Sequence, residues 1–269
     1  MTEKKRIDTE LVRRGLAESR EKAQAAIMAG IVYIGQKKIL KPSETVQESD
    51  EITVREPAVK YVSRGALKLE KAIRVFHADF RNRVVMDVGA STGGFTDVSL
   101  QNGARKVYAI DVGYGQLDWK LRNDERVVVM ERTNARYLDE GAFGEKPEIA
   151  VMDVSFISVK LILPAVINII GDSGIIYSLI KPQFEAGREK VGKKGVVRDP
   201  QVHAEVLNTI MDFTGSIGWC VCGLDYSPIT GPEGNIEFLT EIRKRTDHTT
   251  PAGRDSIREV VDRAHRSLD

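Results

Sequence analysis

Two lysines and two acids stand in apolar surroundings where a folded chain normally avoids charge. Lys68 lies in SRGALKLEKAI, Asp153 in IAVMDVSF, Lys181 in IIYSLIKPQF and Glu237 in GPEGNIEFLTEI. Charged side chains are rarely buried, and those with perturbed pKa values cluster at functional sites. A lysine whose pKa is lowered by burial or by a second cation can take a proton from a weakly acidic hydroxyl, such as a ribose 2′-hydroxyl. The four residue types therefore fit proton abstraction: Lys68 and Lys181, placed close together, are expected to lower each other's pKa, and Asp153 and Glu237 to orient the two ammonium groups.

Each of these four residues also has a purely structural interpretation. Lys68 and Glu237 could be surface charges, and Asp153 could cap a loop. The expected strand order favours a shared site, because ligands of open sheets bind beyond the carboxyl ends of the strands. Asp153 ends the fourth expected strand, Lys181 ends the fifth, and Glu237 begins a last strand that runs in the opposite direction. With Lys68 on the helix before the first strand, all four can meet at one edge of the sheet.

A glycine-rich turn, in VMDVGASTGGFT, follows the first expected strand. Gly89 permits a tight turn, and Gly93 or Gly94 lets the backbone approach a ligand. Asp111 ends the next strand, where an acid binds ribose hydroxyls. Ser91 replaces the glycine that a dinucleotide pyrophosphate needs, so the pattern favours S-adenosylmethionine over a nicotinamide cofactor; a turn that binds no ligand is the other alternative. The expected cofactor contacts are Asp87, Gly89, Ala90, Ser91, Thr92, Gly93, Gly94, Phe95, Asp111, Val112, Asn134 and Asp153.

The composition indicates a globular protein of a reducing compartment. The 269 residues are enough for one full-sized domain and a small one. The net charge of +1 means that any affinity for nucleic acid must come from local patches. The longest apolar stretch, residues 161–170, is shorter than the roughly 20 residues that span a bilayer. Cys220 and Cys222 are too few for a zinc site and are expected to be unpaired, as in a cytoplasmic protein, and no metal is expected.

Residues 66–269 alternate between strand and helix patterns. Strands are expected at 84–88, 107–111, 127–130, 149–154, 175–180, 221–226 and 237–242, and helices at 92–101, 160–170, 204–216 and 256–267. Apolar strands separated by helices predict a mostly parallel sheet covered on both faces. The turn-rich SPITGPEGN leaves no room for a helix, so the last two strands are expected to form a hairpin with the final strand antiparallel. The predicted fold class is α/β, with a Rossmann-like sheet.

Residues 1–57 form a second, smaller unit of the α+β class, which residues 58–65 link to the rest. Two short helical patterns come first, with Asp8 expected to cap the first helix and Ser19 the second. Gly30 can end the second helix in a left-handed turn. The segments IVYIG and EITV then read as strands. A unit of this size is marginal for folding alone but adequate for binding.

At this point the sequence resembles known families. The second unit resembles FtsJ-like RNA 2′-O-methyltransferases, whose Lys-Asp-Lys-Glu tetrad corresponds to Lys68, Asp153, Lys181 and Glu237. RIDTELVRRGLAESREKAQAAIMAGIVYIGQ resembles the RNA-binding domain of small-subunit ribosomal protein S-four. With YVSRGALKL, KPQFE, GVVRDP and GPEGNIEF, essentially the whole chain is similar to the TlyA family, also labelled haemolysin A. The resemblance implies a bacterial cytoplasmic enzyme that methylates a cytidine 2′-hydroxyl in ribosomal RNA, with S-adenosylmethionine as cofactor.

Basic residues outside the tetrad are candidates for contacts with RNA phosphates. They come from the small unit, from the junction and from the long basic loop after Lys181, which we expect to be mobile until RNA binds. A solvated charged surface is the alternative for any single one. The expected partner is ribosomal RNA or a ribosomal subunit, with no membrane and no stable protein partner. The candidate residues are Arg6, Arg14, Arg20, Lys22, Lys37, Lys38, Arg64, Arg188 and Lys193.

Two other functions compete with methyl transfer. A lytic protein, as the haemolysin label suggests, would require an amphipathic membrane element, and none is visible in the sequence. An RNA-binding protein with an inactive Rossmann-like domain is the second alternative, and the intact tetrad argues against it.

Overall fold

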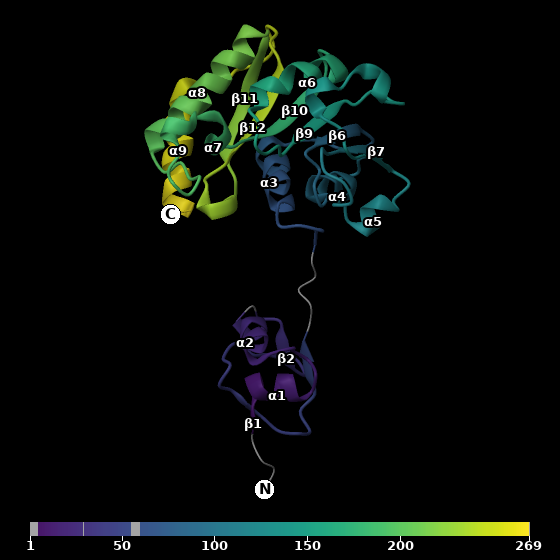
Figure 1. Ribbon diagram of the computed structural model, residues 1–269, viewed down its shortest axis with the longest axis vertical. Coiled ribbons are helices and arrows are strands. Elements are labelled where there is room, and N and C mark those ends of the chain that lie inside the picture. Colours follow the sequence, from purple (N-terminus) through teal and green to yellow (C-terminus); the bar gives the residue numbers. More distant parts are fainter. Residues whose placement is uncertain (1–4, 29, 55–59, 269) are drawn as a thin grey trace. The chain divides into compact units, whose positions relative to one another are not determined.

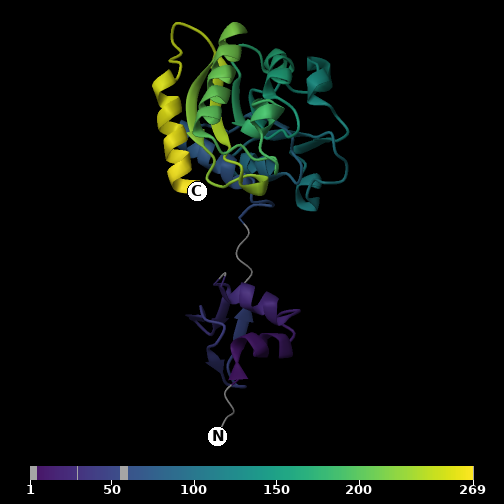
Figure 2. The ribbon, with the colours of Figure 1, turned by 60° about the vertical axis from the view of Figure 1, so that its left-hand side comes forward.

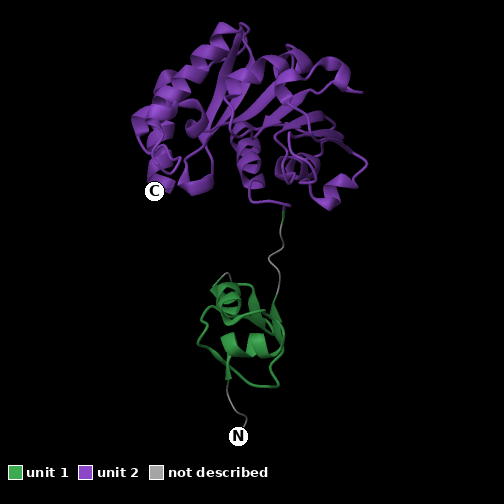
Figure 3. Ribbon diagram, viewed as in Figure 1, with its two compact units in different colours: residues 1–60 green, residues 61–269 purple. Residues whose placement is uncertain are grey.

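The computed structural model describes residues 5–28, 30–54 and 60–268. The chain divides into two compact units, residues 1–60 and 61–269 (Figures 1 and 3). The expected linker, residues 58–65, spans this division, and residues 58 and 59 lie outside the described residues. Tyr61 is buried in the large unit, and the backbone N–H of Val62 donates to Asp97 at 2.9 Å. The end of the expected linker is thus part of the large unit.

A seven-stranded sheet lies at the centre of the large unit, in the order β11-β12-β10-β9-β6-β7-β8. The five strands from β10 to β8 are parallel, and β12 runs antiparallel to both β10 and β11. The predicted sheet, mostly parallel with an antiparallel last strand, is confirmed. The strands are β6 (Val84–Val88), β7 (Lys106–Ile110), β8 (Val127–Met130), β9 (Ile149–Met152), β10 (Ile175–Ile180), β11 (Trp219–Tyr226) and β12 (Phe238–Lys244).

Helices cover both faces of this sheet (Figures 1 and 2). The α-helices are α3 (Ala66–Phe76), α4 (Gly94–Gln101), α5 (Trp119–Arg122), α6 (Leu163–Ile170), α7 (Pro182–Glu185), α8 (Pro200–Ser216) and α9 (Arg254–Leu268). Successive strand residues point to opposite faces. Met86 therefore packs in the core shared with α6, α8 and α9, whereas Val85 packs in the core shared with α3 and α4. Short 3₁₀ turns are η1 (Ala135–Tyr137), η2 (Glu140–Ala142), η3 (Val159–Leu161), η4 (Arg188–Lys190) and η5 (Pro232–Gly234).

Two helices begin at residues other than those predicted, because a capping residue or a turn determines where each helix starts. The helix expected from 204 begins at Pro200, because Asp199 caps it and proline suits the first helical turn. The helix expected from 92 begins at Gly94, because Ser91 and Gly93 have positive φ angles of 48° and 94°. Cys220 and Cys222 are free, with their Sγ atoms 3.5 Å apart. Within the described residues, no helix is long and apolar enough to cross a membrane.

The small unit combines two helices with short strands. It contains β1 (Lys5–Arg6), α1 (Ile7–Arg13), α2 (Arg20–Met28), β2 (Val32–Ile34), β3 (Lys37–Lys38), β4 (Thr45–Val46) and β5 (Ile52–Val54). Its core is formed by Ile7, Leu11, Ala23, Ile27, Val32, Ile39, Val46 and Ile52. Ser19 Oγ accepts from the N–H of Lys22, as the predicted cap of α2 requires, and Gly30 has the expected positive φ of 69°.

The predicted cap of α1 is wrong. The helix begins at Ile7, one residue before Asp8, and its flanking residue Arg6 makes no side-chain capping hydrogen bond. Asp8 instead lies in the first turn with a fully buried side chain. Its carboxylate has side-chain partners from other elements, which are described below.

Candidate active site

The four charged residues of the expected tetrad lie together at one edge of the large sheet. Asp153 follows β9 directly and Lys181 follows β10. Glu237 precedes β12, and the antiparallel register pairs Ile180 with Phe238. This register brings the start of β12 next to the end of β10. Lys68 reaches the same edge from α3.

Asp153 bridges the two lysines. Its Oδ1 lies 2.6 Å from Nζ of Lys181, and its Oδ2 lies 3.2 Å from Nζ of Lys68. Nζ of Lys68 also lies 2.7 Å from Oε2 of Glu237, whose side chain is fully buried. The lysine side chains are 8% and 9% exposed. Two cations and two carboxylates cancel in formal charge, and this mutual pairing makes the burial of Lys68, Lys181 and Glu237 tolerable.

The expectation that the two lysines lower each other's pKa is wrong for Lys68. Burial alone would lower the pKa of Lys68, but the carboxylates of Asp153 and Glu237 together outweigh it and raise the pKa. Lys68 therefore stays protonated at neutral pH. Lys181 contacts only one carboxylate of the tetrad, so the two lysines differ in their surroundings.

The second partner of Lys181 is Ser155, which the sequence interpretation missed. Nζ of Lys181 donates to Oγ of Ser155 at 2.8 Å. Ser155 is exposed and lines the pocket beside the tetrad. The sequence offered one signal for Ser155: it comes two residues after Asp153, just beyond the end of a strand. Ser155 thus connects a buried ammonium group to the pocket.

A cavity of about 440 Å³ opens next to the tetrad. Its volume falls in the usual range for small-molecule sites, roughly 300–1,000 Å³. Of the expected cofactor contacts, those at its wall are Gly89, Ser91, Asp111, Val112, Asn134 and Asp153. Further wall residues are Val88, Ile110, Gln116, Thr133, Ala135, Val154, Ser155, Phe156, Ile157 and Ile162.

The other expected cofactor contacts, Asp87, Ala90, Thr92, Gly93, Gly94 and Phe95, do not line this cavity. Gly89 has the positive φ that the expected tight turn requires, whereas an added Cβ on Gly93 or Gly94 would meet other parts of the protein. A Cβ on Gly93 would lie 2.3 Å from Leu121, and one on Gly94 would lie 2.2 Å from the hydroxyl oxygen of Ser63. Gly89, with φ of 85°, would clash with the carbonyl oxygen of Asp153 at 2.7 Å. These glycines allow protein segments to approach one another.

The cavity suits a nucleoside without phosphates. Ile110, Val112, Ile157 and Ile162 supply apolar walls for a purine ring. The carboxylate of Asp111 accepts the N–H groups of Ser91 at 2.8 Å and Gly113 at 2.7 Å, which hold it at the end of β7. A carboxylate keeps free lone pairs after two such bonds and can accept ribose hydroxyls. Gly93 and Gly94 are packed against other protein segments and do not line the cavity. These features fit S-adenosylmethionine.

Asp87 lies beneath this cavity rather than in its wall. Its side chain is fully buried, and its Oδ2 accepts the hydroxyl of Thr96 at 2.7 Å. Burial raises the pKa of Asp87 to about 7, and the hydrogen bond from Thr96 opposes this only partly. The Oδ1 atom has no hydrogen-bond partner among the described residues. The hydrogen bond from Thr96 thus connects β6 to α4, the two elements on either side of the glycine turn.

Phe156 is a second residue that the sequence interpretation missed. Its side chain is 91% exposed, its φ is 65°, and it lines the cavity three residues after Asp153. The centroid of its ring lies 5.1 Å from that of Phe184, a residue of α7 three positions after Lys181. A positive φ at a bulky residue is uncommon and costs energy. The fold thus presents an aromatic face to solvent beside the tetrad.

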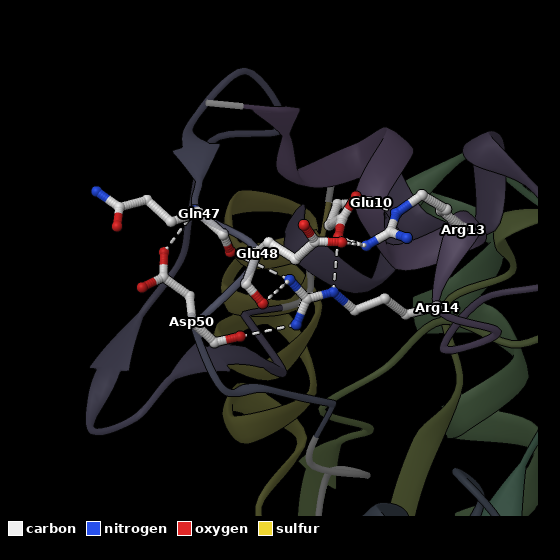
Figure 4. A network of polar contacts seen from close by, with 6 residues as sticks. All are labelled: Glu10, Arg13, Arg14, Gln47, Glu48 and Asp50. Atoms are coloured by element: carbon white, nitrogen blue, oxygen red, sulfur yellow. Dashed lines mark hydrogen bonds and ion pairs between the residues drawn. The ribbon is translucent and has the colours of Figure 1, made fainter. Parts of the chain in front are cut away.

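The candidate RNA contacts of the small unit fall into different surroundings. Arg6 and Arg20 both donate to the buried carboxylate of Asp8. Arg14 belongs to a separate network, in which it donates to Glu10 and to backbone carbonyl groups (Figure 4). Lys22 pairs with Glu18, Lys37 pairs with Glu44 at 2.9 Å, and Lys38 is exposed.

The remaining candidates, Arg64, Arg188 and Lys193, are exposed on the large unit. Arg188 and Lys193 belong to the basic loop between α7 and α8. Asn235, which is buried, holds this loop in place: it donates to the carbonyl of Gly195 at 3.0 Å and accepts the N–H of Val197 at 3.1 Å. Because Asn235 lies two residues before Glu237, the basic loop is connected directly to the tetrad edge.

Comparisons with known proteins show the family to which the chain belongs. The model of the FtsJ-like methyltransferase family matches residues 61–244, and that of the S4 domain matches residues 5–52. The chain is 52% identical to YqxC of Bacillus subtilis (strain 168), over 100% of this chain and 97% of that protein. It is 44% identical to the 16S/23S rRNA (cytidine-2′-O)-methyltransferase TlyA of Mycobacterium tuberculosis (strain H37Rv), over 100% of this chain and 98% of that protein. A solved structure of a hemolysin-named protein from Streptococcus thermophilus aligns with a TM-score of 0.76 at 47% identity, over 99% of this chain and 98% of that chain.

Proposed function

This chain belongs to the FtsJ-like methyltransferase family, and from that membership we propose that it methylates a ribose 2′-hydroxyl in ribosomal RNA. The methyl donor of the family is S-adenosylmethionine, and the target nucleotide we propose is a cytidine. The observation that carries the proposal is the buried Lys-Asp-Lys-Glu cluster, joined through Asp153 at the wall of a cavity that suits a nucleoside. A ribosomal RNA substrate supports a cytoplasmic location for the enzyme.

We assign the base to Lys181. In its neutral form it accepts the proton of the 2′-hydroxyl as the oxygen attacks, while Asp153 and Ser155 hold its nitrogen in place. Lys68 stays charged between its two carboxylates and balances Asp153. Bound S-adenosylmethionine supplies an activated methyl group, whose departure from sulfur needs no acid. Alignment of the attacking oxygen with that methyl group supplies much of the rate.

RNA binding is the proposed role of the basic residues on both units. The small unit matches the S4 domain. Arg6, Arg20 and Lys38 carry its cationic surface, and Arg64, Arg188 and Lys193 are exposed basic residues of the large unit. The junction directly precedes α3, which holds Lys68. The basic loop is hydrogen-bonded to Asn235, which lies two residues before Glu237. Phosphate contacts at these positions would orient the RNA, and the tetrad would select the hydroxyl.

Methyl transfer to ribosomal subunits from cells that lack this gene tests the proposal. We expect the unmodified protein to transfer labelled methyl groups from S-adenosylmethionine to a ribose 2′-oxygen, which mapping of 2′-O-methyl sites locates. Lys181→Ala should lose at least about a hundredfold in rate, the usual worth of a general base. Lys244→Ala, which affects a lysine paired with Asp172 outside the site, is the matched control. Absence of transfer by the unmodified protein, together with leakage of liposomes, would favour the lytic alternative instead.

A further inference from the structure

The carboxylate of Asp8 accepts hydrogen bonds from side chains of two other elements of the small unit, β1 and α2. Oδ1 accepts from Nε of Arg6 at 3.0 Å, and Oδ2 accepts from Nη2 of Arg6 at 2.9 Å. Oδ2 also accepts from Nε of Arg20 at 3.0 Å and from Nε2 of Gln24 at 3.0 Å. The hydrogen bonds from Arg6, and then those from Gln24 and Arg20, outweigh burial and hold the pKa of Asp8 well below its usual range. Asp8 is therefore a permanently charged anchor inside the unit.

The two arginines keep donors for a ligand after binding Asp8. Arg6 uses Nε and Nη2, which leaves Nη1, and Arg20 uses only Nε, which leaves both Nη atoms. Their side chains are 47% and 56% exposed. Within the described part of the chain, these remaining N–H groups make no hydrogen bond. Two guanidinium groups are thus fixed at one end and open to solvent at the other.

Arg14 shows the opposite arrangement (Figure 4). Its Nε donates to Glu10 at 2.7 Å and its Nη1 to the carbonyl of Asp50 at 2.7 Å. Its Nη2 donates to the carbonyls of Gln47 at 3.1 Å and Glu48 at 3.2 Å. The side chain is only 21% exposed. Every nitrogen of this guanidinium is engaged, so Arg14 ties α1 to the segment before β5.

We propose that Asp8 is the positioning residue of a two-arginine site for a phosphate group of RNA, formed by Arg6 and Arg20 and excluding Arg14. The inference rests on the RNA substrate proposed above. Guanidinium groups bind phosphate oxygens through paired N–H donors, and that geometry requires a fixed orientation. Arginine side chains lose considerable rotamer freedom when they are ordered. By ordering them in the free protein, Asp8 removes part of that cost from RNA binding.

The direction in which one substitution changes the affinity for RNA distinguishes a positioning role of Asp8 from a simple effect of its charge. RNA is a polyanion, so neutralising an acid near its binding surface strengthens binding through long-range attraction. Loss of a positioning carboxylate weakens binding, because both arginines become mobile. Asp8→Asn removes the charge with little change in shape and therefore separates the two effects. Glu10→Gln is the matched control, because Glu10 is also buried and also holds two arginines, Arg13 and Arg14.

The experiment measures binding of the full-length variants to a ribosomal RNA fragment over a range of salt concentrations. We expect Asp8→Asn to weaken binding on the order of tenfold, comparable to one charge-assisted hydrogen bond. The plot of log affinity against log salt concentration should become less steep, by about the amount that one phosphate contact contributes. In an Arg6→Ala/Arg20→Ala background, Asp8→Asn should cause no further loss of affinity, and Glu10→Gln should bind RNA at least as tightly as the unmodified protein does. The loss should appear in KM for the RNA.

Three controls keep the outcome decisive. Thermal melting identifies variants in which the small unit unfolds, and Arg20→Lys then serves as the second test: it keeps the charge but has no planar fork, so it should weaken binding as Arg20→Ala does. Unchanged or tighter binding by folded Asp8→Asn, or an additive loss in the double-arginine background, overturns the inference. If the unmodified protein neither binds nor methylates ribosomal RNA, the proposed function itself fails. If it does both and folded Asp8→Asn binds RNA as the unmodified protein does, the inference alone fails.

Discussion

Gly231 leaves open the space that the carboxylate of Glu237 occupies. A Cβ on Gly231 would lie 2.3 Å from Oε1 of Glu237 and 2.8 Å from its Cδ. The φ of Gly231 is −71°, which any residue adopts, so the position requires glycine for clearance rather than for backbone freedom. Glu237 in turn holds Lys68 at 2.7 Å. A glycine in the loop before β12 thus controls where one end of the tetrad lies.

Gly231→Ala should therefore impair catalysis. The added methyl group displaces the Glu237 carboxylate, and through it Lys68, so we expect kcat/KM to fall on the order of tenfold to a hundredfold. Gly215→Ala, in α8 with no atom within 4 Å of the new Cβ, should leave activity unchanged. In a Glu237→Ala background, Gly231→Ala should cost little more. A full additional loss in that background would contradict the proposed connection between these residues.

Ser155→Ala tests whether the second contact of Lys181 matters for the reaction. Removing the hydroxyl deletes the 2.8 Å hydrogen bond and leaves Asp153 as the remaining partner of the ammonium group. Loss of one hydrogen bond to a charged group costs roughly 1.5–3 kcal/mol, so we expect kcat to fall about tenfold to a hundredfold. Ser155→Thr, which keeps the hydroxyl, should recover most of the rate. Equal rates for the alanine and threonine variants would show that the hydroxyl has no such role.

Phe156→Ala tests the exposed aromatic face beside the tetrad. An unstacked nucleobase can lie against an aromatic ring, and such contacts contribute about 1–3 kcal/mol per base. We expect KM for the RNA to rise by roughly fivefold to a hundredfold, while Phe156→Trp keeps KM close to that of the unmodified protein. Because Phe156 also lines the cofactor cavity, calorimetric binding of S-adenosylhomocysteine provides the control. An unchanged KM for the RNA in the alanine variant would exclude stacking.

Asp87 should make the large unit less stable as pH rises. Burial raises its folded-state pKa to about 7 from an ordinary value of 3.8. Between these pH values the folded state binds more protons than the unfolded state, so the free energy of unfolding falls as pH increases through this window. Relative to the unmodified protein, Asp87→Asn should become more stable between pH 4 and pH 8, by up to about 4 kcal/mol. Urea unfolding at several pH values measures this difference.

The control for that prediction is Asp172→Asn, which changes an aspartate whose side chain is 76% exposed. Its stability should follow that of the unmodified protein at every pH, apart from a small constant offset. Parallel curves for Asp87→Asn and the unmodified protein would show that Asp87 does not titrate in this window. The measured quantity is the difference in stability between a variant and the unmodified protein, so the titration of other groups cancels.

Several strands agree residue for residue with the prediction. Val84–Val88, Val127–Met130 and Ile175–Ile180 were expected over the same bounds, because a continuous apolar run is a local property of the chain. Helix starts were less accurate. Asp199 sets the start of α8 through a capping hydrogen bond, and Asp8 was expected to cap α1 but is buried within it. Capping depends on backbone geometry that residue types alone do not specify.

The sequence by itself determined the alternation of strands and helices, and the strand order placed four charged residues at one edge. Only the tertiary structure decided which oxygen of Asp153 meets which lysine, that Gly231 makes room for Glu237, and that Lys68 keeps its proton. It also separated Arg20, with donors to spare, from Arg14, which has none. These relationships depend on distances of about 3 Å between segments far apart in the chain. The periodicity and spacing of residue types do not specify such distances, because the packing of side chains in the folded protein determines them.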